Sequence, residues 1–324
     1  MPSEVEGGRH GFITYVDAGD ARRPWVTSLQ ANRIALPTGV TLNVQTGGAR
    51  DGEPIILLHG FPESHRTWRA VAPDLARDHF VVAPDQRGFA GSDKPEGVDA
   101  YRTETILADL IALADTLGVD RFTLVGHDWG GAIAWLAALR HPDRIARLVI
   151  ANSPHPLIFQ KSLIEEADQR AASQYIRAFR DPGMERAIAA MGIETFYEKT
   201  FGAHTDLTRI PAEERQAYLD QWSAPGALTA MLNWYRASEI VVPAIGEAAG
   251  APAWTLAPFP HLTMPVLVIW GLRDKALLPV QLESLHELVD DLALAATPDA
   301  GHFIPWEHPA FVIAAIRDFI AETA

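Results

Sequence analysis

The segment Gly126–Gly130 contains the residue types and spacing best suited to chemistry. Its sequence, GHDWG, follows the apolar run 122–125 and opens a stretch of small residues typical of a helix. A G-x-S-x-G segment in this context forms a tight turn that lifts a nucleophilic side chain above a sheet. Asp128 takes the central position here, and a carboxylate is ionised at neutral pH without help from a base. The alternative interpretation is an ordinary turn in which Asp128 only caps a helix.

Two further residues follow Asp128 in the order that such a site requires. Asp274 comes shortly after the apolar run 266–270, and His302 lies in a loop near the C-terminus. Nucleophile, acid and histidine occur in this order in the α/β-hydrolase fold. We therefore predict that His302 activates water and that Asp274 orients its imidazole. Asp85 and Asp299 are weaker candidates for the acid, because neither follows a strand in the right order.

The segment His59–Pro62, with sequence HGFP, is a candidate for the second half of the site. It follows the apolar run 55–58 directly. In the α/β-hydrolase fold, backbone N–H groups from this loop and from the residue after the nucleophile form the oxyanion hole. Phe61 and Trp129 are the predicted donors. Read alone, HGFP is also compatible with a simple turn after a strand.

Some histidines and aromatic residues are candidates for the site or its pocket. The chain contains 12 histidines, so a single histidine is more often structural than catalytic. His127 is expected to be structural. His155, at the entrance to the region after the fourth central strand, could line the pocket, although its pattern favours an exposed position. Phe179 and Phe303 would give the pocket an apolar, aromatic character.

Short apolar runs alternate with amphipathic stretches, and this alternation must position the candidate residues. It predicts an α/β fold with a mostly parallel, doubly wound sheet. Apolar residues at helical spacing mark helices over 105–117 and 132–139. The predicted strands span 55–58, 80–83, 122–125, 148–150 and 266–270.

The alternation stops between residues 153 and 261, where no strand is predicted. Helical patterns there cover 165–179, 184–190, 212–218 and 227–235, and 242–260 reads as a loop rich in Pro, Ala and Gly. An all-helical block inserted into an α/β sheet predicts a cap, or lid, domain over residues 153–261. The hydrolase core then comprises 29–152 and 262–324. Residues 1–28 form an N-terminal extension to which we assign no role.

Composition excludes several function classes. The formal net charge of −14 gives little support for a nucleic-acid partner or an anionic membrane surface. The chain has no cysteine, which excludes disulfides, a thiolate nucleophile and a Cys-ligated metal. We see no secretory signal and no apolar run of the roughly 20 residues that span a bilayer. We expect a cytoplasmic protein, either a monomer or a homodimer.

The chain resembles the epoxide hydrolases of the α/β-hydrolase superfamily over roughly residues 29–322. The segments His59–Glu63 (HGFPE), Asp85–Phe89 (DQRGF) and Gly126–Gly130 match the patterns of that family. One departure is Ala90, where glycine is usual; it lies in a structural loop. The resemblance implies an apolar epoxide and water as the partners, with no metal and no cofactor.

The resemblance also implies two tyrosines that bind the epoxide oxygen. The segment Asn233–Arg236 (NWYR) is similar to the family segment that carries one of them, which corresponds to Tyr235. Tyr175 corresponds to the other by its spacing to Pro182-Gly183. Both could instead be ordinary aromatic residues of amphipathic helices. In the implied reaction the epoxide becomes an ester of Asp128, and water releases a vicinal diol.

Other activities of the same fold are alternatives. Haloalkane dehalogenases share the Asp-His-Asp residues, and Trp129 could donate to a halide, but many carry asparagine where this chain has Phe61. Fluoroacetate dehalogenases have arginine in place of Trp129. Hydrolases of esters, thioesters or carbon–carbon bonds would need serine at position 128. A non-catalytic small-molecule receptor is disfavoured because the full set of residues is present.

Overall fold

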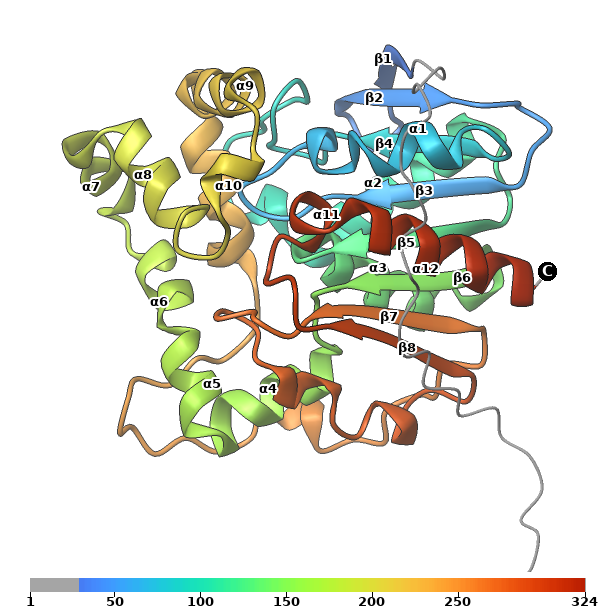
Figure 1. Ribbon diagram of the computed structural model, residues 1–324. Coiled ribbons are helices and arrows are strands. Elements are labelled where there is room, and N and C mark those ends of the chain that lie inside the picture. The colour runs from blue at the N-terminus through green and yellow to red at the C-terminus, as the bar shows by residue number, and fades with distance from the viewer. Residues whose placement is uncertain (1–28, 324) are drawn as a thin grey trace, which may run out of the picture.

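A computed structural model describes residues 29–323 and contains an eight-stranded sheet in the order β1-β2-β4-β3-β5-β6-β7-β8 (Figure 1). β1 and β2 pair antiparallel with their neighbours, and the remaining pairs are parallel. The strands are β1 (Gln30–Ala35), β2 (Thr41–Gly47), β3 (Pro54–Leu58), β4 (Phe80–Pro84), β5 (Phe122–His127), β6 (Ile145–Ala151), β7 (Val266–Gly271) and β8 (Leu292–Thr297). The predicted α/β class with a mostly parallel sheet is confirmed.

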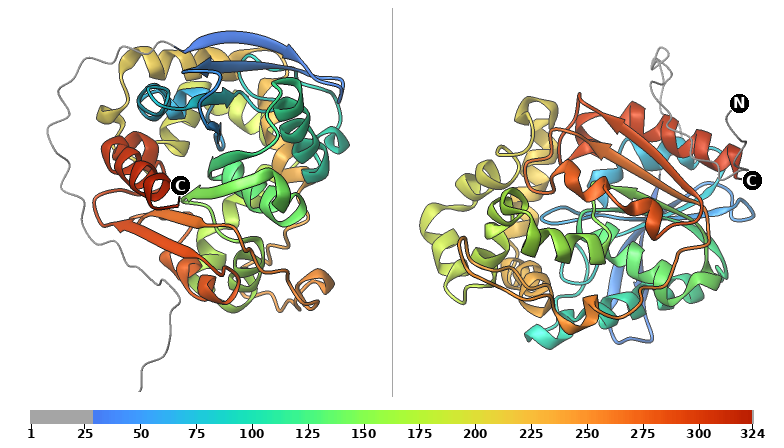
Figure 2. Two further views of the ribbon diagram at one scale, coloured as in Figure 1. Left: turned by 90° about the vertical axis from the view of Figure 1, so that its right-hand side faces the viewer. Right: turned by 90° about the horizontal axis from the view of Figure 1, so that it is seen from below.

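Helices cover both faces of the sheet, as the left view of Figure 2 shows. They are α1 (Val71–Leu75), α2 (Thr103–Thr116), α3 (Trp129–Arg140), α11 (Ile304–Glu307) and α12 (Pro309–Glu322). Successive side chains of a strand point to opposite faces, so a strand buried on both faces is apolar throughout. In β3, Ile55 and Leu57 join the core under α1 and α12, whereas Ile56 and Leu58 join the core under α2 and α3. This two-sided burial is why the central strands appear in the sequence as short continuous apolar runs.

The antiparallel strands β1 and β2 were not predicted from the sequence, and β8, at the other edge of the sheet, was not among the predicted strands either. β1 is exposed along most of its length, so it lacks an apolar run. β2 buries Leu42 and Val44 on one face and leaves the intervening residues partly exposed. Antiparallel strands at the edge of a sheet face water on one side and alternate in this way. The alternation in TLNVQTG was therefore the signal that could have identified β2.

Between β6 and β7 the chain is helical, and we call residues 153–261 the helical insertion. Figure 1 shows its helices beyond the end of the sheet at which the parallel strands terminate. The prediction of one helix over 165–179 is wrong, because that stretch is divided among three helices. α8 and all of α4 except its last residue were missed. The α-helices are α4 (Pro156–Glu165), α5 (Ala167–Ala172), α6 (Gln174–Arg180), α7 (Met184–Met191), α8 (Ile193–Thr200), α9 (Ala212–Ser223) and α10 (Ala227–Ala237).

The predicted N-terminal extension, residues 1–28, lies outside the described residues. Within residues 29–323, no helix combines the length and the apolar composition that a membrane crossing requires.

Candidate active site

Asp128 lies in a strained turn between β5 and α3. Its backbone angles, φ 50° and ψ −121°, fall in a region that residues with a side chain rarely adopt. The turn fits only because its neighbours lack side chains. A Cβ on Gly126 would lie 2.4 Å from the Gly130 carbonyl oxygen, and a Cβ on Gly130 would lie 2.3 Å from the Leu58 carbonyl oxygen. The two glycines of the predicted motif are thus a steric requirement of the turn that presents Asp128.

The loop after β3 lies against the Asp128 carboxylate. The Phe61 amide donates a hydrogen bond to Oδ1 of Asp128 at 2.7 Å. A Cβ on Gly60 would lie 2.4 Å from the Asp128 Cβ, so the close approach depends on glycine there. Trp129, the other predicted donor, is the first residue of α3, and within residues 29–323 its amide makes no hydrogen bond to this carboxylate. One of the two predicted donors is therefore in hydrogen-bonding position.

His302 joins Asp128 to Asp274. Its Nε2 lies 3.5 Å from Oδ2 of Asp128, and its Nδ1 lies 2.8 Å from Oδ2 of Asp274. The two rival acids lie elsewhere. Asp85 bonds His65 and Asn43, and Asp299 is exposed beside Arg273. The structure thus brings together the three residues that the sequence singled out.

Asn152 fixes the Asp274 carboxylate and was not predicted from the sequence. Its amide donates to Oδ2 of Asp274 at 2.8 Å, and its side-chain oxygen accepts from the Gly271 amide at 2.8 Å. The backbone amides of Ala276 and Leu277 donate to the other carboxylate oxygen at 2.8 and 2.9 Å. These hydrogen bonds fix the orientation of the Asp274 carboxylate, and Oδ2 also bonds Nδ1 of His302.

Glu63 and His127 hold the backbone of His302 in place through a chain of hydrogen bonds. The ring of His127 bonds the His302 carbonyl oxygen through Nε2 at 2.7 Å and Oε2 of Glu63 through Nδ1 at 2.8 Å. The Trp306 indole donates to Oε1 of Glu63 at 3.1 Å, and the Thr67 hydroxyl bonds the same oxygen. His127 thus has the structural role predicted for it. The HGFPE and GHDWG segments are joined through this buried pair.

The charges of the three central residues stabilise one another. Burial by itself would lower the pKa of His302, but the Asp274 charge and the bond to Asp128 raise it well above its ordinary value. Burial opposes ionisation of Asp128 and Asp274, and the adjacent His302 more than compensates and lowers the pKa of both carboxyls. The free site therefore holds an imidazolium between two carboxylates.

Aromatic side chains from the helical insertion pack against Phe61 and Trp129, the two neighbours of Asp128. Tyr235 of α10 packs against Phe61, Trp129 and Phe179 with ring centroids 5.0, 5.2 and 5.0 Å away. The ring of Tyr175, from α6, lies 6.1 Å from that of Tyr235. Burial, followed by nearby groups that include Asp128, raises the pKa of both hydroxyls well above 10, so both are protonated at neutral pH.

Comparison with known proteins identifies the family. A family model of the α/β-hydrolase fold matches residues 53–309. The superfamily protein YfhM of Bacillus subtilis is 34% identical over 283 residues, covering 87% of this chain and 95% of YfhM. Epoxide hydrolase A of Mycobacterium tuberculosis is 30% identical over 320 residues, covering 89% of this chain and 96% of that protein. A solved structure from work on novel epoxide hydrolases in metagenomes of hot environments has a TM-score of 0.84 and 46% identity, and covers 90% of this chain and 99% of the other.

The chain belongs to the epoxide hydrolases of the α/β-hydrolase superfamily. The family predicted from HGFPE and GHDWG is confirmed, and at the level of the family the reaction is the hydrolysis of an epoxide.

Two pocket candidates of this epoxide hydrolase, Phe303 and His155, differ in their surroundings. Phe303 is buried, with its ring 4.9 Å from that of His302. The expectation that His155 is exposed is wrong: its ring lies between Trp135 and Phe259, at 5.1 and 5.2 Å, and its Nδ1 caps α4. The interleaved packing of three aromatic rings leaves no periodic signal in the sequence, which explains the error.

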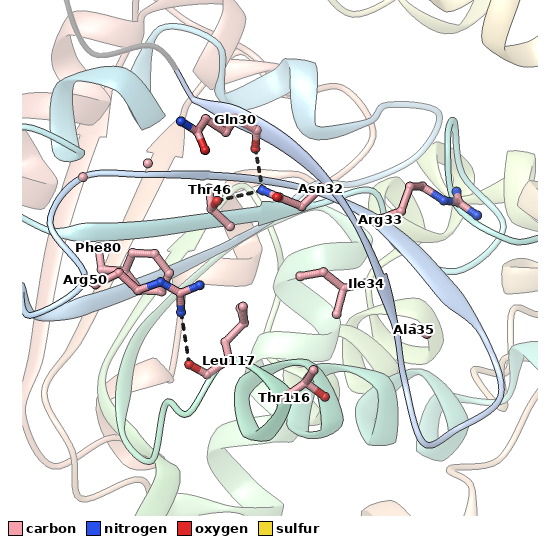
Figure 3. A pocket seen from close by; sticks show the side chains of 12 residues that line it. Gln30, Asn32, Arg33, Ile34, Ala35, Thr46, Arg50, Phe80, Thr116 and Leu117 are labelled. Atoms are coloured by element: carbon pink, nitrogen blue, oxygen red, sulfur yellow. Dashed lines mark hydrogen bonds between the residues drawn. The ribbon is translucent and has the colours of Figure 1, made fainter.

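A separate pocket of about 650 Å³ lies between β1, β2 and the end of α2 (Figure 3). Its lining includes Arg33, Arg50 and Phe80, and Arg50 donates to the Leu117 carbonyl oxygen at 3.4 Å. Phe80 begins β4, whereas Asp128 follows the last residue of β5, so the pocket lies at the opposite end of the parallel strands. It contains none of the candidate site residues.

We predict that Gly130→Ala destabilises the protein and removes activity. Alanine normally favours a helix over glycine by about 1 kcal/mol, but here its Cβ would overlap the Leu58 carbonyl oxygen. Overpacking of this kind costs about 1–3 kcal/mol. The measurement is the free energy of unfolding in denaturant, alongside diol formation. Gly250→Ala is the control, because a Cβ there meets nothing within 4 Å. If Gly130→Ala were as stable and active as Gly250→Ala, the steric account of the turn would be wrong.

Proposed function

We propose that this epoxide hydrolase acts through a covalent ester between the substrate and Asp128. The observation that carries the proposal is that the two oxygens of the Asp128 carboxylate have different surroundings. Oδ1 accepts from the Phe61 amide at 2.7 Å, and Oδ2 lies 3.5 Å from Nε2 of His302. One oxygen is thus held by the backbone, and the other is available to attack.

In the first step, Oδ2 of Asp128 attacks an epoxide carbon. The ring carbon–oxygen bond breaks, and the released oxygen takes a proton from Tyr175 or Tyr235. Tyrosine suits this role because an alkoxide is much more basic than a tyrosinate, and both hydroxyls are protonated at neutral pH. The imidazolium of His302 balances the Asp128 charge before the attack.

In the second step, water attacks Cγ of Asp128 while one of its protons passes to Nε2 of His302. Negative charge develops on Oδ1, where the Phe61 amide donates and where Trp129 is the proposed second donor; one such donor contributes roughly 3 kcal/mol. The bond between Cγ and the alkyl oxygen then breaks, and the diol leaves with the proton from His302. Before the water attacks, the tyrosinate of the first step takes the original proton of His302, which leaves His302 neutral. The second proton of the water then returns to His302 and restores the imidazolium.

The same geometry explains why His302 becomes a base only after the ester has formed. In the free site, Asp128 and Asp274 together hold the pKa of His302 well above its ordinary value. Once Asp128 is an ester, its charge is gone and its bond to the imidazole is weakened. Burial then weighs more heavily against the imidazolium, and the pKa of His302 falls. Formation of the ester is therefore what prepares His302 to accept a proton from water.

The helical insertion is proposed to act as the cap of the site. It supplies Tyr175, Phe179 and Tyr235, whose rings contact one another and the core residue Phe61. Asp128, His302 and Asp274 are only 9%, 5% and 3% exposed. A lining of aromatic rings over a nearly dry carboxylate favours an apolar epoxide, and exclusion of water strengthens the electrostatic interactions in the site.

We predict that His302→Gln accumulates the ester. Glutamine cannot accept the proton from water, so the first step proceeds and the second stops. Intact-mass spectrometry after mixing with styrene oxide should detect protein plus one substrate. Asp128→Ala is the control and should give neither adduct nor diol. Absence of an adduct in His302→Gln, with an epoxide that the wild type converts, would contradict the two-step reaction.

We predict that the two steps differ in their pH dependence. Hydrolysis needs neutral His302, so its rate constant should rise with pH through the pKa of His302 in the ester and then level off. Alkylation needs an ionised Asp128 and a protonated tyrosine. The pKa of Asp128 is lowered and the pKa values of Tyr175 and Tyr235 are raised. The alkylation rate should therefore be nearly flat over about pH 6–9. Single-turnover kinetics across this range would test both statements.

An independent check of this pH behaviour is Asp128→Asn, which mimics the neutral ester. NMR titration should find a lower pKa for His302 in this variant than in the wild type. An unchanged pKa would contradict the proposed switch.

We predict that Tyr175→Phe and Tyr235→Phe each slow alkylation by about 10–10³-fold, the size typical of losing a general acid or part of one. Tyr197→Phe is the matched control from the same insertion, because its hydroxyl is buried and has no partner within residues 29–323. Stopped-flow tryptophan fluorescence measures the alkylation rate. If both site variants behaved like Tyr197→Phe, the role given to the tyrosines would be wrong.

A further inference from the structure

We propose that His204 is a positioning residue for the hydrolytic half of the reaction: it holds water beside His302. This inference rests on the proposed two-step function and adds a residue to its second step. His204 belongs to the helical insertion, in the turn that follows α8 (Ile193–Thr200).

The ring of His204 lies against the base of the proposed reaction. Its centroid is 5.9 Å from that of His302 and 6.3 Å from that of Phe303. The two backbones are also close, because a Cβ on Gly301 would lie 3.1 Å from the His204 carbonyl oxygen. The turn that carries His204 thus packs against Gly301, the residue that precedes His302.

The polar atoms around this turn lack partners. Nδ1 of His204 and the hydroxyl of Thr205 are buried and make no hydrogen bond within the described part of the chain. The same holds for Oε1 of Glu307, which would lie 3.4 Å from a Cβ on Gly301. Buried polar atoms are almost always hydrogen-bonded, and buried water is the usual partner where the protein supplies none. A water molecule bonded to Nδ1 of His204 satisfies this requirement next to His302.

The position of His204 separates the two steps. Its ring neighbours are His302 and Phe303, whereas Tyr235 packs against Phe61, Trp129 and Phe179. In the proposed reaction, His204 therefore lies near the water that His302 activates, and the tyrosines lie near the epoxide oxygen. His204 is half-buried as a residue, and its Nδ1 is a buried atom.

His204 is neutral when it acts. Burial and the adjacent His302 lower its pKa to about 4, against the opposing charges of Asp274 and Asp128. Lys275 acts in the same direction as His302. A neutral imidazole offers one donor and one acceptor to water, and it adds no positive charge that would weaken His302 as a base.

The test compares three substitutions in single-turnover reactions with styrene oxide. His204→Leu removes the polar atoms; His204→Asn retains a polar atom near the position of Nδ1; His204→Gln places one near Nε2 instead. We expect His204→Leu to slow hydrolysis of the ester about tenfold, the size of one lost hydrogen bond to a buried group. Alkylation should change less than about twofold, and the ester should therefore accumulate. Asn should restore most of the hydrolysis rate, and Gln should not.

Stopped-flow fluorescence gives the two rate constants, and rapid-quench mass spectrometry gives the ester fraction. Equal slowing of both steps, or hydrolysis by His204→Leu at the wild-type rate, would overturn the role of His204. If His204→Leu does not fold, the Asn and Gln variants still decide, because equal hydrolysis rates for the two would also overturn it. Absence of ester in His302→Gln would instead overturn the two-step function itself.

Discussion

The structure depends on keeping two carboxylates ionised beneath a covering layer of aromatic rings. Removing a carboxylate from water costs several kcal/mol unless charge and hydrogen bonds replace the solvent. His302 supplies the charge for both Asp128 and Asp274. Hydrogen bonds come from Phe61 on one side and from Asn152 on the other. Each of these residues follows a different strand, so the central sheet is the frame that balances the buried charge.

This balance also determines what the site can do. In the proposed reaction, the attacking Asp128 is one of the two charges that hold the proton on His302. In that reaction, ester formation removes this charge, so the imidazolium gives its proton to the tyrosinate and His302 becomes a base. The arrangement links the two proposed half-reactions through electrostatics alone. Tyr175 and Tyr235 belong to the first half-reaction, and the proposed water beside His204 belongs to the second.

Much of this site could be predicted because its chemistry lies at strand ends. GHDWG after the 122–125 run and Asp274 after the 266–270 run each follow a buried strand, and parallel strands end at the same edge. Asn152 and Glu63, and His204 with the role proposed for it, were not predicted because their contacts join segments far apart in the chain. Glu63 stood within a recognised motif, but only the fold brings it to His127. His204 lies in an irregular turn, and no sequence pattern distinguishes it from the other histidines.

The exposed β1 and the broken helices of the insertion were missed for a related reason. A periodic pattern of apolar residues identifies elements that bury one face against a core. β1 buries no face, so it has no such pattern. In the insertion, α4, α5 and α6 follow one another with single-residue breaks, which a continuous amphipathic pattern hides.

The most direct test of the central claim is a single turnover in water labelled with oxygen-18, with enzyme in excess over styrene oxide. Attack of water on Cγ transfers the oxygen of Asp128 to the diol and leaves the solvent oxygen on the protein. The account predicts one oxygen-18 atom in the peptide that contains Asp128 and none in the diol. Oxygen-18 in the diol after that first turnover, with an unlabelled Asp128, would mean that water opens the epoxide directly and would contradict the account.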